Sequence, residues 1–245
     1  MKKCLLAAVA GLSLAAFAAT VSFAQTSPAI QNEPGPYARI AMFHPLDGHN
    51  VDFEAAYIRH LEWHHAAKDT WSWYGYTIHY SDRRYWFIYA TFGHAAGDFD
   101  HPVDPAGDDL HNTMHVMPHV ENWKNAIYQF LPAVSKGPSE TGVPTPRVRT
   151  EMVTVELKPG TEKAFEAALA AGKAALKDET LWYRLVQGGK APRYLRLRPY
   201  DDFAAVLQSA EDQTLPDKAN SLVADLTIEI VSLRPTMSYN LPAVR

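Results

Sequence analysis

One pattern of strands and helices occurs twice in this chain. Residues 37–134 and 147–239 both have the order strand, helix, strand, strand, helix, strand, with a glycine turn after the first strand. Residues with geometric roles also match in the same order in both halves: Gly48 with Gly160, Phe53 with Phe165, Trp73 with Trp182, and Tyr85 with Tyr194. Chance does not explain matches in one order, so the pattern predicts two copies of one folding unit.

The expected elements can be placed by residue number. The first half has strands at 38–44, 71–80, 85–92 and 126–131, and helices at 52–69 and 110–117. The second half has strands at 150–157, 181–186, 194–197 and 226–233, and helices at 162–177 and 202–209. Segments that are polar or rich in proline and glycine predict a disordered leader at 25–36, a linker at 135–146 and a C-terminal tail at 240–245.

A β-α-β-β-α-β unit is the ferredoxin-like motif, an antiparallel sheet with both helices on one face. The other face needs a cover, and the second copy can supply it. On this element order and duplication, residues 37–239 resemble the dimeric α/β-barrel superfamily. The resemblance implies an α+β fold in which two ferredoxin-like units pack sheet to sheet as an intramolecular pseudo-dimer. The superfamily includes cofactor-free monooxygenases, haem-degrading and haem-peroxidase proteins, lactone isomerases and binding modules, so the fold does not select a function.

The first 24 residues have the pattern of a secretory signal. Lys2 and Lys3 precede an apolar run that ends in small residues, so we expect cleavage after Ala24 and a periplasmic or secreted mature chain. The run is shorter than the roughly 20 residues of a membrane-spanning helix, and we expect no integral membrane segment in the mature chain. Cys4 leaves with the signal, so the mature chain has neither disulfides nor thiolate chemistry.

The overall charge argues against one class of partner. With a net charge of -4 and a pI near 6.2, the chain has no basic stripe of the kind that binds nucleic acid. We expect a small-molecule ligand instead. The sequence leaves the oligomeric state open, with a homo-oligomer as one alternative.

All eleven histidines lie between His44 and His119, in the first half. In its first helix, His60 and His64 stand where the second half has small or apolar core residues. Two histidines one helical turn apart can bind one metal ion, or can serve as general acid and base. The alternative is a pair of buried imidazoles hydrogen-bonded to neighbouring hydroxyls or carbonyls. We take His60 and His64 as candidate metal ligands and candidate catalytic residues.

A second histidine pair is expected on the helix at 110–117. His111 and His115 are also one turn apart, and Met114 and Met117 add thioethers, which together with imidazole suit copper or haem iron. The alternative is an amphipathic helix with methionines in the core and histidines in water. Both helices of the unit cover one sheet face, so we expect a shared pocket with four candidate metal ligands: His60, His64, His111 and His115. Whether it holds haem, a transition metal or no cofactor stays open.

The first half is also rich in aromatic residues. An aromatic pocket with a few polar groups is the usual small-ligand site, and the candidate ligand-binding residues are Tyr57, Trp73, Tyr74 and Trp86. In the third strand we expect Trp86, Ile88 and Ala90 to lie under the helices.

On the other face of that strand, Tyr85, Phe87 and Tyr89 align with Tyr194, Arg196 and Arg198 of the second half. We therefore expect Arg196 or Arg198 to stack on an aromatic ring of the first half.

Two further groups give weaker signals. The five aspartates of residues 97–109 lack the spacing of an EF-hand loop, and they predict solvated caps and turns. His44, His49 and His79 fall near one rim of the expected sheet and form a second possible cluster.

Three functions fit the sequence. One is an exported small-ligand-binding protein whose first-half pocket is haem- or metal-dependent and redox-active. Another is a cofactor-free monooxygenase or isomerase that acts on an aromatic substrate with a histidine as general base. The third is a non-catalytic binding module. The sequence does not decide whether the chain is an enzyme, and in each case the second half is the structural partner.

Overall fold

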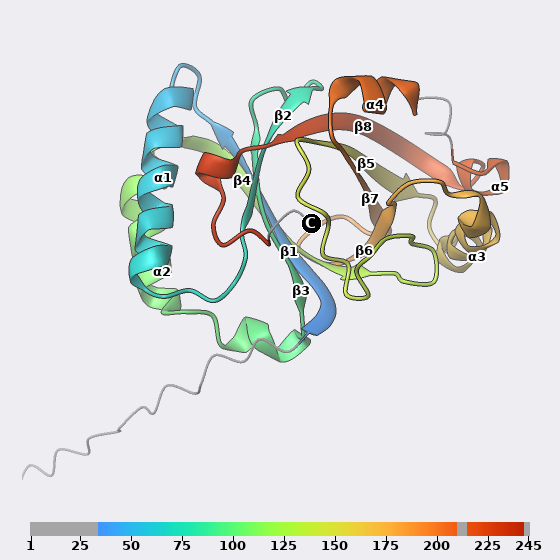
Figure 1. Cartoon of the computed structure of the whole chain (residues 1–245), viewed down its shortest axis with the longest axis horizontal. Coiled ribbons are helices and arrows are strands. Elements are labelled where there is room, and N and C mark those ends of the chain that lie inside the picture. The colour runs from blue at the N-terminus through green and yellow to red at the C-terminus, as the bar shows by residue number, and fades with distance from the viewer. Residues whose placement is uncertain (1–33, 210–214, 243–245) are drawn as a thin grey trace, which may run out of the picture.

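The computed structural model describes residues 34–209 and 215–242 and has a closed eight-stranded barrel with helices outside it (Figure 1). The first half contains β1 (Pro34–Pro45), α1 (Asn50–Ala66), β2 (Tyr74–Tyr80), β3 (Phe87–His94), α2 (Pro105–His115) and β4 (Val120–Phe130). The second half contains β5 (Arg149–Leu157), α3 (Glu162–Gly172), β6 (Leu181–Gln187), β7 (Arg193–Tyr200), α4 (Phe203–Gln208), α5 (Asp217–Asn220) and β8 (Val223–Leu233). The expected signal lies outside the described residues.

The strands close into one antiparallel barrel in the order β1-β3-β2-β8-β5-β7-β6-β4. Within it the first half has the order β4-β1-β3-β2 and the second half the same order, β8-β5-β7-β6. The halves join where their edge strands pair, β2 with β8 and β4 with β6. The expectation of an α+β barrel fold is confirmed. Pairing at both junctions removes the free strand edges that an open sheet would expose.

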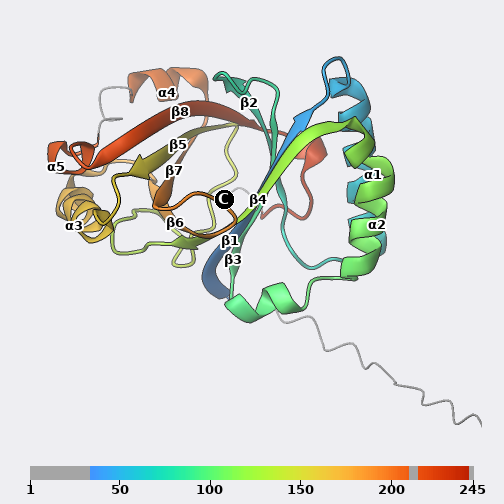
Figure 2. The ribbon, with the colours of Figure 1, turned by 180° about the vertical axis from the view of Figure 1, so that it is seen from behind.

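The helices lie outside the barrel. Figure 2 shows α1 and α2 side by side against the outer face of the first half, with α3 at the far end over the second half. Where the first half has α2, the second half has the two short helices α4 and α5. Within residues 34–209 and 215–242, no helix is long and apolar enough to cross a membrane.

Strand alternation divides the side chains between the barrel interior and the outer face. Ile88 of β3 and Leu195 and Leu197 of β7 are in the interior core, whereas Phe87 and Tyr89 pack outward under α1. The expectation that Ile88 and Ala90 lie under the helices is therefore wrong. A period of two separates the two faces of a strand, but it does not say which face the helices cover.

The two arginines of β7 follow the same alternation. Arg196 donates to Glu151 at 2.8 Å and lies over Trp182, while Arg198 lies over Tyr200, so these partners all belong to the second half. The expected stacking on a first-half aromatic ring is wrong. The helix-covered face of each half points away from the other half, so these side chains do not meet across the barrel.

The matches expected between the halves hold at the first turn but not at the third strand. Gly48 and Gly160 both have positive φ, at 81° and 78°, where glycine carries no steric penalty. Tyr85, by contrast, lies in a turn at φ 72° and is 49% exposed, whereas Tyr194 is buried in β7.

Strand pairing shows that the third strands of the two halves match with a shift of two residues from the expected alignment. Phe43 of β1 pairs with Phe87, and Val155 of β5, at the same distance before its turn glycine, pairs with Tyr194. Phe87 is therefore the equivalent of Tyr194. The expected match of Trp73 with Trp182 is displaced by the same shift. A shift of two residues keeps every side chain on its own face, so the pattern alone does not reveal it.

The segment expected to be a linker packs against one end of the barrel. The Tyr74 hydroxyl donates to the Pro144 carbonyl at 3.2 Å, and the Tyr183 hydroxyl donates to the Gly142 carbonyl. Val143 packs against the interior core. These contacts hold residues 142–144 in place. At the N-terminal side, residues 34–36, expected in the leader, belong to β1.

Candidate functional site

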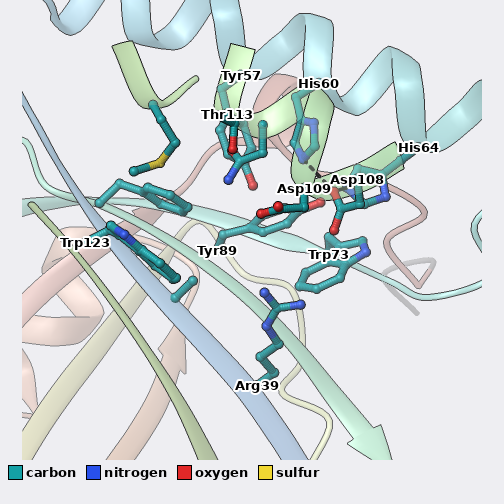
Figure 3. A pocket seen from close by; sticks show the side chains of 14 residues that line it. Arg39, Tyr57, His60, His64, Trp73, Tyr89, Asp108, Asp109, Thr113 and Trp123 are labelled. Atoms are coloured by element: carbon teal, nitrogen blue, oxygen red, sulfur yellow. Dashed lines mark ion pairs between the residues drawn. The ribbon is translucent and has the colours of Figure 1, made fainter. Parts of the chain in front are cut away.

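A cavity of about 250 Å³ lies between the helices and the outer face of the sheet in the first half (Figure 3). Its walls combine aromatic and polar side chains, and several titratable groups meet at one side. The lining residues are Arg39, Ala41, Phe43, Tyr57, His60, His64, Trp73, Tyr89, Asp108, Asp109, Asn112, Thr113, Met117 and Trp123.

The two helices bring the titratable groups together for local reasons. Tyr57, His60 and His64 lie on the buried stripe of α1, which faces the sheet. α2 begins at Pro105, earlier than expected from its periodicity, because the Asp104 side chain caps it by accepting from the Gly107 amide at 3.1 Å. This early start places Asp108 on a helix that packs against α1, rather than in a solvated turn.

Three potential metal ligands converge at this side of the cavity. His60 Nε2 lies 3.1 Å and His64 Nε2 3.8 Å from Asp108 Oδ1, and the three ligand atoms lie within 4.8 Å of one another. Two ligands at about 2.1 Å from one ion are roughly 3.0 Å apart at a right angle and roughly 3.4 Å apart at the tetrahedral angle. The separations therefore suit a single ion with small adjustments of the side chains.

A second layer of groups holds the two imidazoles. His64 Nδ1 lies 2.8 Å from Asp69 Oδ2, and the same carboxylate accepts from the Trp73 indole at 2.8 Å and from the Trp71 amide at 3.0 Å. His60 Nδ1 lies 3.1 Å from His111 Nδ1. A carboxylate on the far nitrogen of a histidine fixes its tautomer and leaves Nε2 available to a metal.

Two buried polar atoms at the cavity, His64 Nε2 and Asn112 Oδ1, have no hydrogen-bond partner among the described residues. The buried Tyr57 and Tyr89 hydroxyls interact only with each other there. Buried polar groups are nearly always hydrogen-bonded, because leaving one unpaired costs roughly 1–3 kcal/mol. Two such atoms lining one cavity point to an ion or a ligand as the missing partner.

The pKa shifts favour metal binding at neutral pH. Burial lowers the pKa of His60, although the hydrogen bond with Asp108 opposes this shift. For Asp108, burial acts to raise the pKa, but the hydrogen bond from His60 and the nearby His64 outweigh it, and the pKa is lowered. A neutral imidazole beside an ionised carboxylate is the protonation state that a metal ion requires.

The structure brings only some of the sequence-predicted site residues together. His60, His64, Tyr57 and Trp73 line the cavity, and His111 contacts His60. His115 packs against the His111 ring, at 4.4 Å between centroids, and does not line the cavity.

Two of the candidate ligand-binding residues, Tyr74 and Trp86, do not line this cavity. Tyr74 is inside the barrel, because it directly follows Trp73 in extended backbone at the start of β2 and so points to the opposite face. Trp86 packs against the interior core and stacks on His44.

Sequence reasoning missed Asp108, Asp69 and Arg39. Asp108 precedes His111 by one helical turn, a spacing that would have suggested a shared face had the start of α2 been recognised. Asp69 lies only five residues after His64, just beyond the end of α1, whereas Arg39 gives no local signal, because β1 approaches the histidines only in the folded chain.

A second group of potential ligands lies at the other end of α1. His49 Nδ1 is 3.3 Å from His119 Nδ1 and 3.8 Å from Asp52, and His49 and Asp52 are more exposed than any ligand of the first group. The expected cluster of His44, His49 and His79 is not formed, since His44 pairs with Glu121 at 2.8 Å and His79 is exposed.

The three-ligand group itself does not fit a haem iron. A porphyrin occupies four positions in a plane and leaves two on opposite sides of the iron, which places axial ligand atoms roughly 4.2 Å apart at bonds of about 2.1 Å. The separations of His60 and His64 from Asp108, 3.1 and 3.8 Å, are those of ligands on one side of an ion. No step of haem chemistry is assigned to this group.

No family model and no curated protein matches the sequence. Solved structures do share its fold. A protein of Lactobacillus acidophilus NCFM, provisionally assigned as a monooxygenase, has a TM-score of 0.56 at 9% identity over 84% of this chain and 96% of that one. A protein of Fusobacterium nucleatum with the same provisional assignment has a TM-score of 0.58 at 10% identity, over 82% and 93%.

A mutant chlorite dismutase of Candidatus Nitrospira defluvii is also similar. Its TM-score is 0.52 at 11% identity, over 84% of this chain and 94% of that one. Identity this low shows a common fold and nothing about the chemistry. The chain therefore has the fold of the dimeric α/β-barrel superfamily.

Proposed function

We propose that this chain is an exported, small-molecule-binding metalloprotein that holds one metal ion through His60, His64 and Asp108. The observation that carries the proposal is the convergence of these three ligand atoms within 4.8 Å beside an aromatic cavity. The signal-like first 24 residues support export. In this proposal the halves form an intramolecular pseudo-dimer that arose by duplication, and the second half serves as the structural partner.

The ligand set favours a redox-active ion. Two histidines and one carboxylate on one side of an ion, with positions left open, are the ligands of non-haem iron(II) oxygenases, while zinc sites use similar donors. Bound iron of this kind supplies the activation of dioxygen for oxidation of an organic ligand. The protein's part is to keep His64 in one tautomer through Asp69, and to present the ligand from aromatic walls.

A cofactor-free reaction is the second candidate, because His60 and Asp108 form a hydrogen-bonded pair at the cavity. Burial lowers the pKa of His60, which keeps its imidazole neutral and available as a general base at neutral pH. Turnover of an aromatic substrate by fully metal-free protein would favour this alternative. Binding without any turnover would favour a non-catalytic module.

The direct test is metal binding by variants of the two histidine groups. Metal-free protein is titrated with Fe²⁺ under anaerobic conditions and with Zn²⁺, and metal content is also measured on the protein as purified. We expect one tight equivalent per chain, lost in His60→Ala/His64→Ala and in Asp108→Ala. The matched control, His49→Ala/His119→Ala, removes two histidines from the more exposed group and should keep the tight equivalent. Full metal binding by the His60→Ala/His64→Ala variant would overturn the proposal.

A further inference from the structure

Arg39 is a fixed cation on the wall of the cavity, apart from the three metal ligands. Its Nε donates to Asn125 at 3.1 Å, and its guanidinium lies over the Trp73 ring at 5.6 Å. In Figure 3 the side chain rises from β1 below the cavity, while His60, His64 and Asp108 lie on the opposite side. Among the described residues, no carboxylate forms an ion pair with Arg39, and its Nη atoms have no acceptor there.

The second half has a different residue at the position equivalent to Arg39. Arg39 pairs with Thr91 in the β1–β3 ladder, and the matching place in the β5–β7 ladder is held by Glu151, opposite Arg198. Glu151 is fully buried and ion-paired with Arg196 at 2.8 Å. One half therefore neutralises its buried charge internally, and the other leaves a cation facing a cavity. A purely structural role of Arg39 would not require it to face a cavity without an ion-pair partner among the described residues.

The aromatic and apolar part of the wall indicates the kind of ligand that fits. Phe43, Trp73, Tyr89 and Trp123 present aromatic surface, and Met117 and Ala41 add apolar atoms. The volume of about 250 Å³ lies below the roughly 300–1,000 Å³ of pockets for drug-sized ligands, so it suits a single ring. A planar guanidinium with free Nη atoms matches a carboxylate, which can accept two parallel hydrogen bonds.

We propose that the cavity binds a single-ring aromatic carboxylate, with the carboxylate on Arg39 and the ring between the aromatic walls and the metal ligands. This inference rests on the proposed function, because it names the substrate class of the same site. In this arrangement Arg39 fixes the acid group away from the metal ligands. The ring is then the part of the molecule that lies towards His60, His64 and Asp108.

The experiment compares acids with their uncharged amides. Benzoate, 4-hydroxybenzoate and phenylacetate, each paired with its amide, are titrated by calorimetry into metal-free and Zn²⁺-loaded protein, with cyclohexanecarboxylate as the non-aromatic acid. We expect at least one aromatic acid to bind about 10- to 100-fold more tightly than its amide, the effect of a charge-assisted hydrogen bond to the half-buried Arg39. Arg39→Gln should abolish this preference, and Arg39→Lys should keep part of it.

The controls separate this inference from the metal proposal. Arg184→Gln removes a partly exposed arginine that pairs with Glu166 in the second half, and it should leave acid binding unchanged. Arg39→Gln should bind Zn²⁺ with the same stoichiometry as the parent protein, which also shows that it folds. Two results would overturn this inference and leave the metal proposal standing. One is equal binding of every acid and its amide. The other is no acid binding by metal-loaded protein that has normal metal content. Preference for acids in a chain that binds no metal supports it and overturns the metal proposal.

Discussion

The carboxylate of Asp69 controls which nitrogen of His64 is free for a metal, so Asp69→Asn should weaken metal binding although Asp69 is not a ligand. In the parent chain Oδ2 accepts from the Trp73 indole and lies 2.8 Å from His64 Nδ1. With Nδ1 protonated, Nε2 carries the lone pair that a metal needs. An asparagine NH₂ at the Oδ2 position would donate to Nδ1 instead, which moves the proton to Nε2 and blocks it.

The opposite orientation of the amide is also unfavourable. It keeps an oxygen near His64, but its NH₂ group then faces the Trp71 amide, which now donates to Asp69 Oδ1 at 3.0 Å. Each buried donor left without an acceptor costs roughly 1–3 kcal/mol, and we expect the free energy of unfolding of the metal-free chain to fall by about this amount. Loss of an outer-sphere partner weakens metal affinity roughly 10- to 100-fold, which is about 1.4–2.8 kcal/mol.

The assay is competition for Zn²⁺ between the protein and a coloured chelator, together with urea unfolding of the metal-free chain. Asp98→Asn is the matched control: Asp98 is equally buried, accepts from the Ala95 amide at 3.1 Å and lies near His94 rather than near the three ligands. It should lose stability but keep metal affinity. Asp69→Asn with the metal affinity of the parent chain would refute the argument about the tautomer.

The remaining predictions concern stability. Gly142→Ala should destabilise the fold by roughly 2 kcal/mol or more, since Gly142 has φ 77° and a Cβ would lie 2.4 Å from the Phe130 ring. The control is Gly97→Ala, whose Cβ meets open space. Equal urea midpoints for the two variants would contradict this prediction. Tyr89→Phe removes a buried hydroxyl whose one described neighbour is the Tyr57 hydroxyl, so the free energy of unfolding of the metal-free protein should change by no more than about 1 kcal/mol, and a larger loss would contradict this. Burial lowers the pKa of His94, so the unfolded chain binds more protons and stability should fall as the pH drops from about 6.5 through the lowered folded value. His94→Gln should reduce this fall in a urea series across pH, and parallel curves for both proteins would exclude it.

The local sequence pattern is sufficient to predict the architecture. The repeated order of strands and helices predicts an α+β barrel, and turn glycines at Gly48 and Gly160 hold equivalent places because each needs a positive φ that other residues avoid. The helical spacing of His60 and His64 predicts a shared face, and both lie on the buried face of α1 in the folded chain. These features depend on neighbours within a few residues, which is why they are readable in the sequence.

The tertiary structure alone decided the direction of the faces and the partners of the histidines. Alternation groups Ile88 with Ala90 and Phe87 with Tyr89, but the closure of the barrel determined which pair is inside. Arg39 comes to the cavity from β1, far in sequence from the two helices, and Asp108 comes from a helix whose start depends on a cap. Non-local pairing of strands and packing of helices set these contacts, and no period along the chain encodes a contact between segments so far apart.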